Sequence, residues 1–305
     1  MEMLPLILAT IFTAATPLLI AGLGEHVVER AGVLNLGVEG MMIVGAATGF
    51  AAAVLSDSSV IGLMAGALAG MALAAVFGLL VIFFATNQVA TGLALTILGL
   101  GLAGLIGQGF VGQPRGAIPP VEIPLLKEIP VLGKAIFTGD PVFFLSIGLV
   151  VLVAYTLTRT RVGLLVRAVG ENHASAHALG LPVRKLRFYA ILFGGLMAGL
   201  AGAYLSLIYT RFWSPGMSAG RGWIALALVV FAAGHVWRLV LGAYLFGGIT
   251  VAQLHAQAGA IALPSQLLSA LPYLMTIAAL MVLSLSGRKG AGAAGSLGQP
   301  FVPER

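Results

Sequence analysis

The chain has 305 residues, of which 59% are hydrophobic and 9% charged, and its mean hydropathy is +1.06. Soluble domains are typically about 45–50% apolar and about 25% charged, so this composition excludes a soluble protein and indicates a membrane protein. The net charge of +6 does not indicate nucleic-acid binding, because the basic residues cluster at the predicted membrane edges, where they set topology and contact anionic lipid. The absence of cysteine excludes disulfides, thiolate metal sites and thiol catalysis.

Apolar runs of about 20 residues, the length that crosses a bilayer, recur from the N-terminus to residue 285. They predict an all-α fold, a polytopic transmembrane helical bundle with no soluble domain between its spans. The nine predicted spans are 4–24, 33–55, 59–85, 88–111, 141–158, 188–210, 222–238, 239–258 and 265–285. Residues 1–287 then form one transmembrane domain, and 288–305 form a flexible tail.

Lysine and arginine predict the orientation of this bundle. The loop over 159–187 holds six basic residues and the tail three more, so both are expected in the cytoplasm. An odd number of spans then places the N-terminus outside, together with the proline-rich connection over 112–140. The basic residues of the loop and tail are Arg159, Arg161, Arg167, Arg184, Lys185, Arg187, Arg288, Lys289 and Arg305.

Small residues recur at four-residue spacing in two of the spans. The run GLMAGALAG carries Gly62, Gly66 and Gly70, and GGLMAGLAGAY carries Gly195 and Gly199. Glycines on one helix face allow two backbones to approach closely, which drives helix association in lipid. The pattern predicts a tightly packed bundle, and both a transporter and a structural membrane protein fit it.

Ionisable side chains are scarce inside the spans. Of ten acidic residues only Glu39 falls within one, about a turn from the expected cytoplasmic edge. Two readings stay open: a carboxylate hydrogen-bonded to Asn35 or to a freed backbone amide, and a role in a transport path. Asn87 and Gln88 lie near a span end, where interfacial hydration is the default explanation. Because no acid–histidine relay crosses the membrane, an external energy source is favoured over ion coupling.

The energy source does not reside in this chain. Gly133-Lys134 is followed by Ala135, without the serine or threonine and the upstream glycine that a phosphate-binding Walker A loop requires. We therefore expect no ATP hydrolysis by this chain, no catalytic residue and no cofactor.

The stretch RAVGENHASAHALGLPVRKLR, residues 167–187, predicts a short capped helix. Asn172 suits the N-cap, Gly180 the C′ position, and Pro182 prevents continuation. Such a helix is too short to be stable alone in water, so a surface must hold it. It is either a rigid docking element or an ordinary interfacial loop. His173 and His177 are four residues apart, but without a third ligand nearby we expect no metal site.

The segment over 159–207 resembles the cytoplasmic loop and following helix of the permeases of bacterial ABC importers in the branched-chain amino acid, ribose and nucleoside group. The G-E-N-x-x-x-A-x-x-x-G pattern, formed here by Gly170, Glu171, Asn172, Ala176 and Gly180, matches the segment that forms the coupling helix in such permeases. The run ERAGVLNLGVEGMMIVGA over 29–46 resembles more narrowly the nucleoside and simple-sugar branch.

The resemblance implies an inner-membrane permease subunit, with the segment near 171–181 coupling to the ATPase. Cytoplasmic ATP-binding subunits, an extracytoplasmic substrate-binding protein and a second, longer permease are the implied partners. Nucleosides are the expected cargo, with simple sugars or branched-chain amino acids as alternatives. An ion-coupled secondary carrier and a non-transporting scaffold remain as other classes. Possible path or gate residues are Asn35, Glu39, Asn87 and Gln88.

Overall fold

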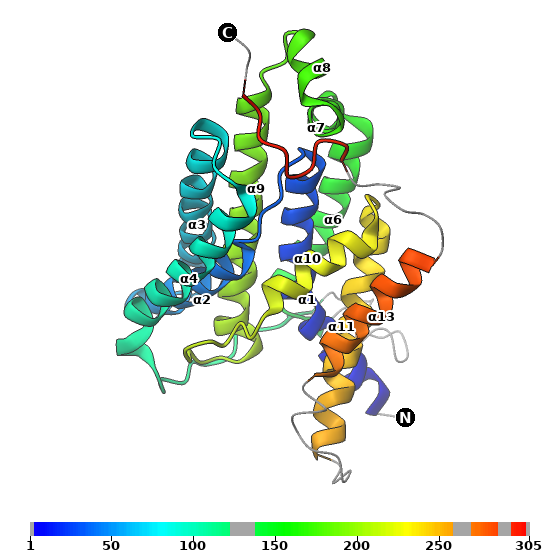
Figure 1. The fold of residues 1–305 in the computed structure, drawn as a ribbon. Helices are drawn as coiled ribbons and strands as arrows, with labels where there is room; N and C mark the ends of the chain where they lie inside the picture. Colours follow the sequence, from blue (N-terminus) through cyan, green and yellow to red (C-terminus); the bar gives the residue numbers. More distant parts are fainter. Residues whose placement is uncertain (1–2, 123–137, 259–269, 286–293, 303–305) are drawn as a thin grey trace.

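The computed structural model of the chain describes residues 3–122, 138–258, 270–285 and 294–302. Besides helices, turns and loops, this part holds two short strands, β1 (Val121–Glu122) and β2 (Thr138–Gly139), which pair antiparallel. The predicted all-α bundle is therefore confirmed (Figure 1). The helices are α1 (Met3–Arg30), α2 (Val38–Ser56), α3 (Ser59–Gly78), α4 (Gln88–Gly107), α6 (Pro141–Arg159), α7 (Arg161–Glu171), α8 (His173–Ala178), α9 (Val183–Tyr204), α10 (Arg221–Ala232), α11 (Val236–Ala258) and α13 (Leu271–Leu285). Short turns of other helix types extend α3 (η1, Leu79–Phe83), α4 (η2, Gln108–Phe110) and α9 (η4, Leu205–Tyr209).

Seven helices of the described part are long and apolar enough to cross a membrane. The structure does not confirm nine spans. Where we expect a span over 222–238, α10 has only 12 residues, or about 18 Å, because Ala233 and Gly234 take left-handed backbone conformations (φ 45° and 79°) that end the helix. Of the predicted span over 265–285, the structure describes α13. The orientation of the termini stays a prediction.

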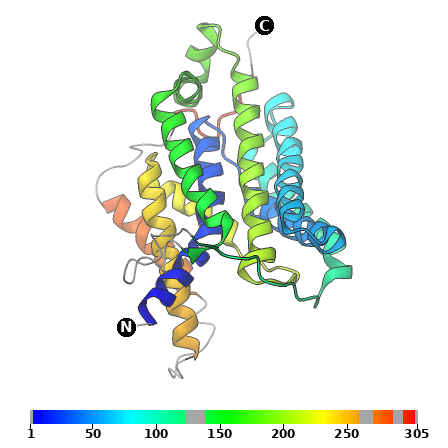
Figure 2. The same cartoon turned by 180° about the vertical axis from the view of Figure 1, so that it is seen from behind.

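A seam of glycines joins α2, α3 and α9. This glycine seam consists of Gly45, Gly66, Gly70, Gly195 and Gly199, and its backbones are in direct contact. A Cβ added at Gly70 would lie 2.4 Å from the carbonyl oxygen of Gly195, and one at Gly199 would lie 2.3 Å from that of Gly66. The two views of the ribbon show α3 and α9 side by side (Figures 1 and 2). The predicted close packing of these spans is confirmed.

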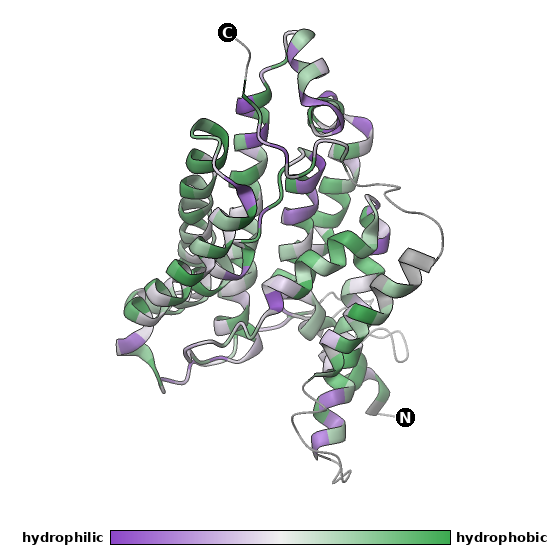
Figure 3. Ribbon diagram, in the orientation of Figure 1, coloured by the Kyte–Doolittle hydropathy of each residue, from purple (hydrophilic) through white to green (hydrophobic). Residues whose placement is uncertain are grey.

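Polar residues gather at one end of the bundle, where α7 and α8 lie. Figure 3 shows hydrophobic colours along the long helices and hydrophilic ones around α7, α8 and the C-terminal end of α1. Residues 294–302, drawn in red in Figure 1, run across this same end. We refer to it as the α8 end.

Candidate functional site

The predicted capped helix is present as α8. The side chain of Asn172 accepts a hydrogen bond from the amide of Ser175 at 2.9 Å. At the other end Gly180 has φ 79°, its amide donates to the carbonyl of His177 at 2.8 Å, and the amide of Leu181 donates to that of Ala176 at 3.0 Å. The second bond is the 6→1 bond of a Schellman motif, which satisfies a carbonyl that the helix end leaves free.

The five predicted coupling residues fall into two groups. Glu171, Asn172 and Gly180 are exposed at the surface of the α8 end. Gly170 and Ala176 face inward: a Cβ on Gly170 would lie 2.1 Å from the carbonyl oxygen of Arg30, and Ala176 is buried. Gly170 and Ala176 therefore fix the position of the segment, whereas the other three are accessible.

Leu179, directly after α8, is 81% exposed and is the large apolar side chain at the tip of this segment. Ala174 and Ala178 are exposed beside it on α8. Single exposed apolar side chains are common on protein surfaces, so it is the combination of Leu179 with a rigid, capped helix outside the membrane-length helices that suits a contact with another protein. Our sequence analysis missed Leu179, because a leucine in a strongly apolar chain carries no local signal of exposure.

Residues 294–302, which we call the strap, pack against α7 and α8. They lie within the predicted flexible tail. The amide of Ser296 donates to the carbonyl of Gly170 at 2.8 Å, and the amide of His173 donates to the Ser296 hydroxyl at 3.2 Å. The Phe301 ring is buried and makes edge contacts with the rings of His173 and His177, each at 5.3 Å between centroids. The strap therefore covers the inner side of α8.

The two histidines of α8 take part in the packing between α8 and the strap. His173 Nδ1 lies 3.2 Å from a guanidinium nitrogen of Arg187. Burial, and secondly the charge of Arg187, lower the pKa of the His173 imidazole from its usual 6.5. In the described part of the chain no group of three metal-ligating side chains is present.

Glu39 caps the first turn of α10. Its carboxylate accepts hydrogen bonds from the Ser218 hydroxyl at 2.6 Å and from the amides of Gly220 and Gly222 at 2.9 and 2.6 Å. A negative charge at a helix N-terminus is stabilised by the free amides and by the helix dipole. Of the partners expected for Glu39, the freed backbone amide is confirmed, while Asn35 bonds elsewhere.

Asn35 pairs with Glu25 of α1. The backbone amide and side-chain amide of Asn35 each donate to the Glu25 carboxylate at 3.3 Å, and the Asn35 side-chain oxygen accepts from the amide of Gly37 at 3.0 Å. Asn35 and Glu25 are both buried. They hold the connection between α1 and α2, residues 31–37, inside the bundle.

Gln88 and Asn87 open α4 in different ways. Gln88 is buried, not hydrated as we expect from its place at a span end, and its side-chain oxygen accepts from the amide of Leu34 at 2.8 Å. Asn87 is exposed and caps α4, accepting from the amide of Ala90 at 2.9 Å. Asn35 and Gln88 thus both hold the 31–37 connection, Glu39 holds α10, and Asn87 caps a helix.

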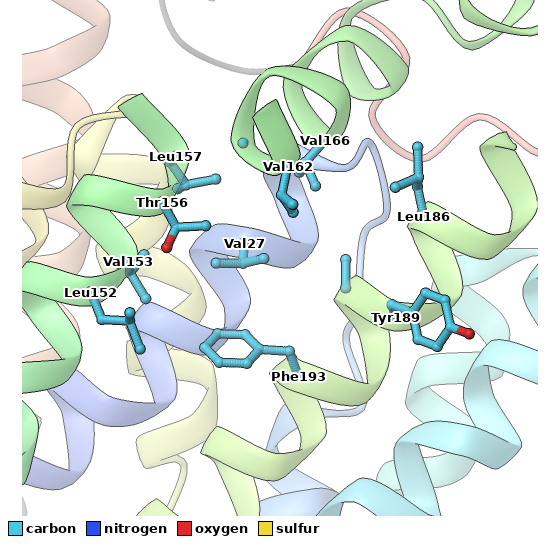
Figure 4. Close-up of a pocket in the computed structure, with 12 residues that line it drawn as sticks. Val27, Leu152, Val153, Thr156, Leu157, Val162, Val166, Leu186, Tyr189 and Phe193 are labelled. Carbon is cyan, nitrogen blue, oxygen red and sulfur yellow. The ribbon is translucent and has the colours of Figure 1, made fainter. Parts of the chain in front are cut away.

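An apolar cavity of about 460 Å³ lies beside α7. Its walls come from α1, α6, α7 and α9, with Val27, Leu152, Val166 and Phe193 among the lining residues (Figure 4). Burying hydroxyl groups without hydrogen-bond partners is costly, so this lining does not suit a hydroxyl-rich solute. The cavity leaves room next to the helix that precedes α8.

Seven membrane-length helices define a multi-pass membrane protein, in which α10 is a short helix within the bundle and α8 is a partly exposed helix at one end. The chain belongs to the family described as branched-chain amino acid transport system / permease component, whose model matches residues 7–280. It is a multi-pass protein of the inner membrane, and its relatives are permease subunits of ABC transporters.

Three relatives match along most of their length. TsgC13 of Haloferax volcanii, named for a glucose ABC transporter permease, is 43% identical over 88% of each chain. The guanosine ABC transporter permease NupQ of Bacillus subtilis is 34% identical over 92% of each chain, and the nucleoside ABC transporter permease NupC of Lactococcus lactis is 31% identical over 90% of each. No solved structure matches the chain.

More distant permeases of the same named transporters also match. TsgB13 of Haloferax volcanii is 25% identical over 80% of this chain and 68% of its own length. NupP of Bacillus subtilis is 26% identical over 79% of this chain and 71% of its own length.

Proposed function

We propose that the chain is the permease subunit of an ATP-driven importer, that the α8 end faces the cytoplasm, and that a separate ATPase docks on α8. The observation that carries the proposal is Leu179, 81% exposed at the tip of a segment that is capped at both ends. Exposing a leucine to water at a rigid tip costs free energy, which burial against a partner recovers. An ordinary interfacial loop does not require an exposed leucine on a segment that is capped at both ends.

The mechanism begins with closure of the ATPase, which displaces α8. Because α7 directly precedes α8 and packs on α6, displacement of α8 tilts α6 and α7 against the glycine seam, to which α9 belongs. The route of the solute through the membrane then opens or closes at the polar groups inside the bundle. We assign Asn35, Glu39 and Gln88 to holding the gate, since their polar atoms bond to the 31–37 connection and to the N-terminus of α10.

For the cargo, we propose a nucleoside, as the pattern over 29–46 predicts. NupQ and NupC, named for guanosine and nucleoside transport, support this choice. A simple sugar is the second candidate, because the 43% identical TsgC13 is named for glucose. Both cargoes are neutral and rich in hydroxyl groups, so their recognition does not require a charged side chain.

For the assembly, we propose pairing with a second, longer permease, together with a substrate-binding protein outside. Two organisms each contribute a pair of matches named for one transporter: TsgC13 with TsgB13, and NupQ with NupP. The alignments cover a smaller share of TsgB13 and NupP than of this chain, so those two are the longer chains. This chain resembles the shorter member in both cases.

The docking test compares Leu179→Arg with Leu55→Arg, since Leu55 at the end of α2 is 79% exposed and is a matched control. We expect Leu179→Arg to abolish co-purification of the ATPase and ATP-dependent uptake, and Leu55→Arg to preserve both. Retention of the ATPase by Leu179→Arg contradicts the docking role.

The cargo test measures uptake of labelled adenosine in cells with and without this chain, in competition with excess uridine, glucose, ribose or leucine. Competition by uridine alone supports a nucleoside importer. Absence of chain-dependent adenosine uptake, together with chain-dependent uptake of labelled glucose, supports the sugar. Uptake that survives ATP depletion but collapses with the ion gradient would establish an ion-coupled carrier.

A further inference from the structure

We propose that the strap, residues 294–302, is a required part of the ATPase-docking element: it keeps α8 ordered and passes its displacement, through Arg187, to the buried 31–37 connection. The inference rests on the proposed function, because the partner is the same ATPase. It adds a second segment, about 120 residues away in the chain, to the docking element.

The first argument is that α8 depends on the strap for its order. The helix has six residues, far fewer than the roughly 12–15 that an isolated helix needs to be even marginally stable. Its buried side chain, Ala176, lies in an apolar cluster with Val169, Val183 and Phe301. Phe301 is the largest member of this cluster, and it contributes the ring contacts to both histidines of α8. Removal of Phe301 therefore opens the packed side of α8.

The second argument is that Arg187 connects four segments. Its side chain is fully buried in the first turns of α9. It donates to the carbonyls of Ala31 at 3.1 Å, Gln299 at 3.0 Å and Ser296 at 3.5 Å, and it lies 3.2 Å from His173 Nδ1. A guanidinium is planar and rigid, so these partners are held in fixed directions from one another. Movement of α8 or of the strap therefore reaches the residue that begins the 31–37 connection.

The strap also contacts α4. The side-chain nitrogen of Gln88 donates to the carbonyl of Gln299 at 3.5 Å, while the side-chain oxygen of Gln88 accepts from Leu34. Through Arg187 and Gln88, the same strap carbonyl is linked to both Ala31 and Leu34. The connection that carries Asn35 is thus tied at two points to the segment that covers α8.

The test uses the absence of cysteine in the chain, which makes Ser175→Cys, exposed on α8, a unique attachment point for a nitroxide label. In the full complex we compare Phe301→Ala with Val302→Ala, because Val302 is the exposed neighbour of Phe301 in the strap. We expect Phe301→Ala to make the nitroxide mobile and to lower ATPase co-purification and uptake by about tenfold, the change that about 1.4 kcal/mol of lost docking free energy produces. Val302→Ala should match the unsubstituted chain.

A nitroxide that remains immobile in Phe301→Ala overturns the inference, and so does normal uptake by a chain with a mobile nitroxide. Deletion of residues 294–305 provides a second variant that leaves every membrane-length helix intact, with the same expected results. If Leu179→Arg and Phe301→Ala both keep the ATPase, the docking role itself is wrong. If Leu179→Arg loses the ATPase and Phe301→Ala keeps it, only the strap inference is wrong.

Discussion

The glycine seam and two of the short helices, α8 and α10, are held in opposite ways. In the seam, backbones of α2, α3 and α9 touch directly, with no space for a single added carbon. The short helices have six and 12 residues, and polar caps and left-handed residues bound them: Asn172 and Gly180 at α8, Glu39 and Ala233 at α10.

This difference separates a scaffold from parts that can move. Close-packed interiors resist small displacements, so the seam keeps its three helices in one arrangement. A short helix with its own caps keeps its internal hydrogen bonds when it shifts as a unit, because the backbone rotations fall on the flanking residues. Transport in our account therefore moves α8 and α10 against a seam that stays fixed.

The largest effect is expected from breaking the seam. Gly199→Ala places a Cβ 2.3 Å from the carbonyl oxygen of Gly66, and the backbone has to shift. We expect a loss of about 3 kcal/mol in the free energy of unfolding, measured from thermal unfolding of the purified protein in detergent. Gly104→Ala in α4 is the matched control, since no atom lies within 4 Å of its added Cβ and alanine favours the helix. Equal melting temperatures for the two variants would contradict the close packing of the seam.

The next effect is expected at the N-terminus of α10. Glu39→Gln removes the charge and one acceptor from a carboxylate that receives three hydrogen bonds. We expect a loss of about 2 kcal/mol in the free energy of unfolding, accompanied by reduced uptake. Thermal unfolding and uptake are to be measured on the same preparation. Normal stability with lost uptake would instead indicate that Glu39 contacts the cargo.

A smaller effect, in the stabilising direction, is expected at the C-terminal end of α10. Ala233 has φ 45°, which costs an alanine about 1–2 kcal/mol and a glycine nearly nothing. Ala233→Gly should therefore raise the free energy of unfolding by about 1 kcal/mol. The preceding Ala232→Gly lies within the helix and should lower it by about the same amount or more. Destabilisation by both variants would exclude a left-handed residue at 233.

The smallest effect concerns pH at α8. Burial beside Arg187 lowers the pKa of His173, so protonation of this imidazole opposes its folded position. The contribution of the neutral His173 side chain to the order of α8 is complete above pH about 6.5, and it is lost as pH falls from there through the lowered pKa. Because His173 is partly exposed, we expect a modest gain in mobility of a nitroxide at Ser175→Cys on acidification, reduced in His173→Asn. The charged group that faces His173 is Arg187, and His177 lies across the Phe301 ring. If the mobility of the nitroxide in the unsubstituted chain does not change with pH, His173 does not contribute to the packing of α8.

Local signals in the sequence predicted much of this arrangement. Glycine spacing predicted close-packed faces on α3 and α9, and Asn172, Gly180 and Pro182 predicted a capped helix, because caps and small-residue faces are encoded within a few residues. The length of α10 was not predictable in this way, since Ala233 carries no preference for the conformation that ends the helix.

The candidate site depends on contacts between distant segments. Glu39 meets residues about 180 positions away, and the strap meets α8 across more than 120. Helices that are apolar on all sides give no indication of which face meets which neighbour. The same limitation explains why the inward direction of Ala176 and the exposure of Leu179 were found only in the structure.

The most direct measurement places a photo-cross-linking amino acid at position 179 of the full chain in intact cells and identifies the protein that becomes attached. Our account predicts a cross-link to a cytoplasmic ATP-binding subunit, and none when the same amino acid stands at position 55. A cross-link from position 179 to a substrate-binding protein outside the cell, or none to any ATP-binding subunit, would contradict both the docking role of α8 and the orientation that we propose.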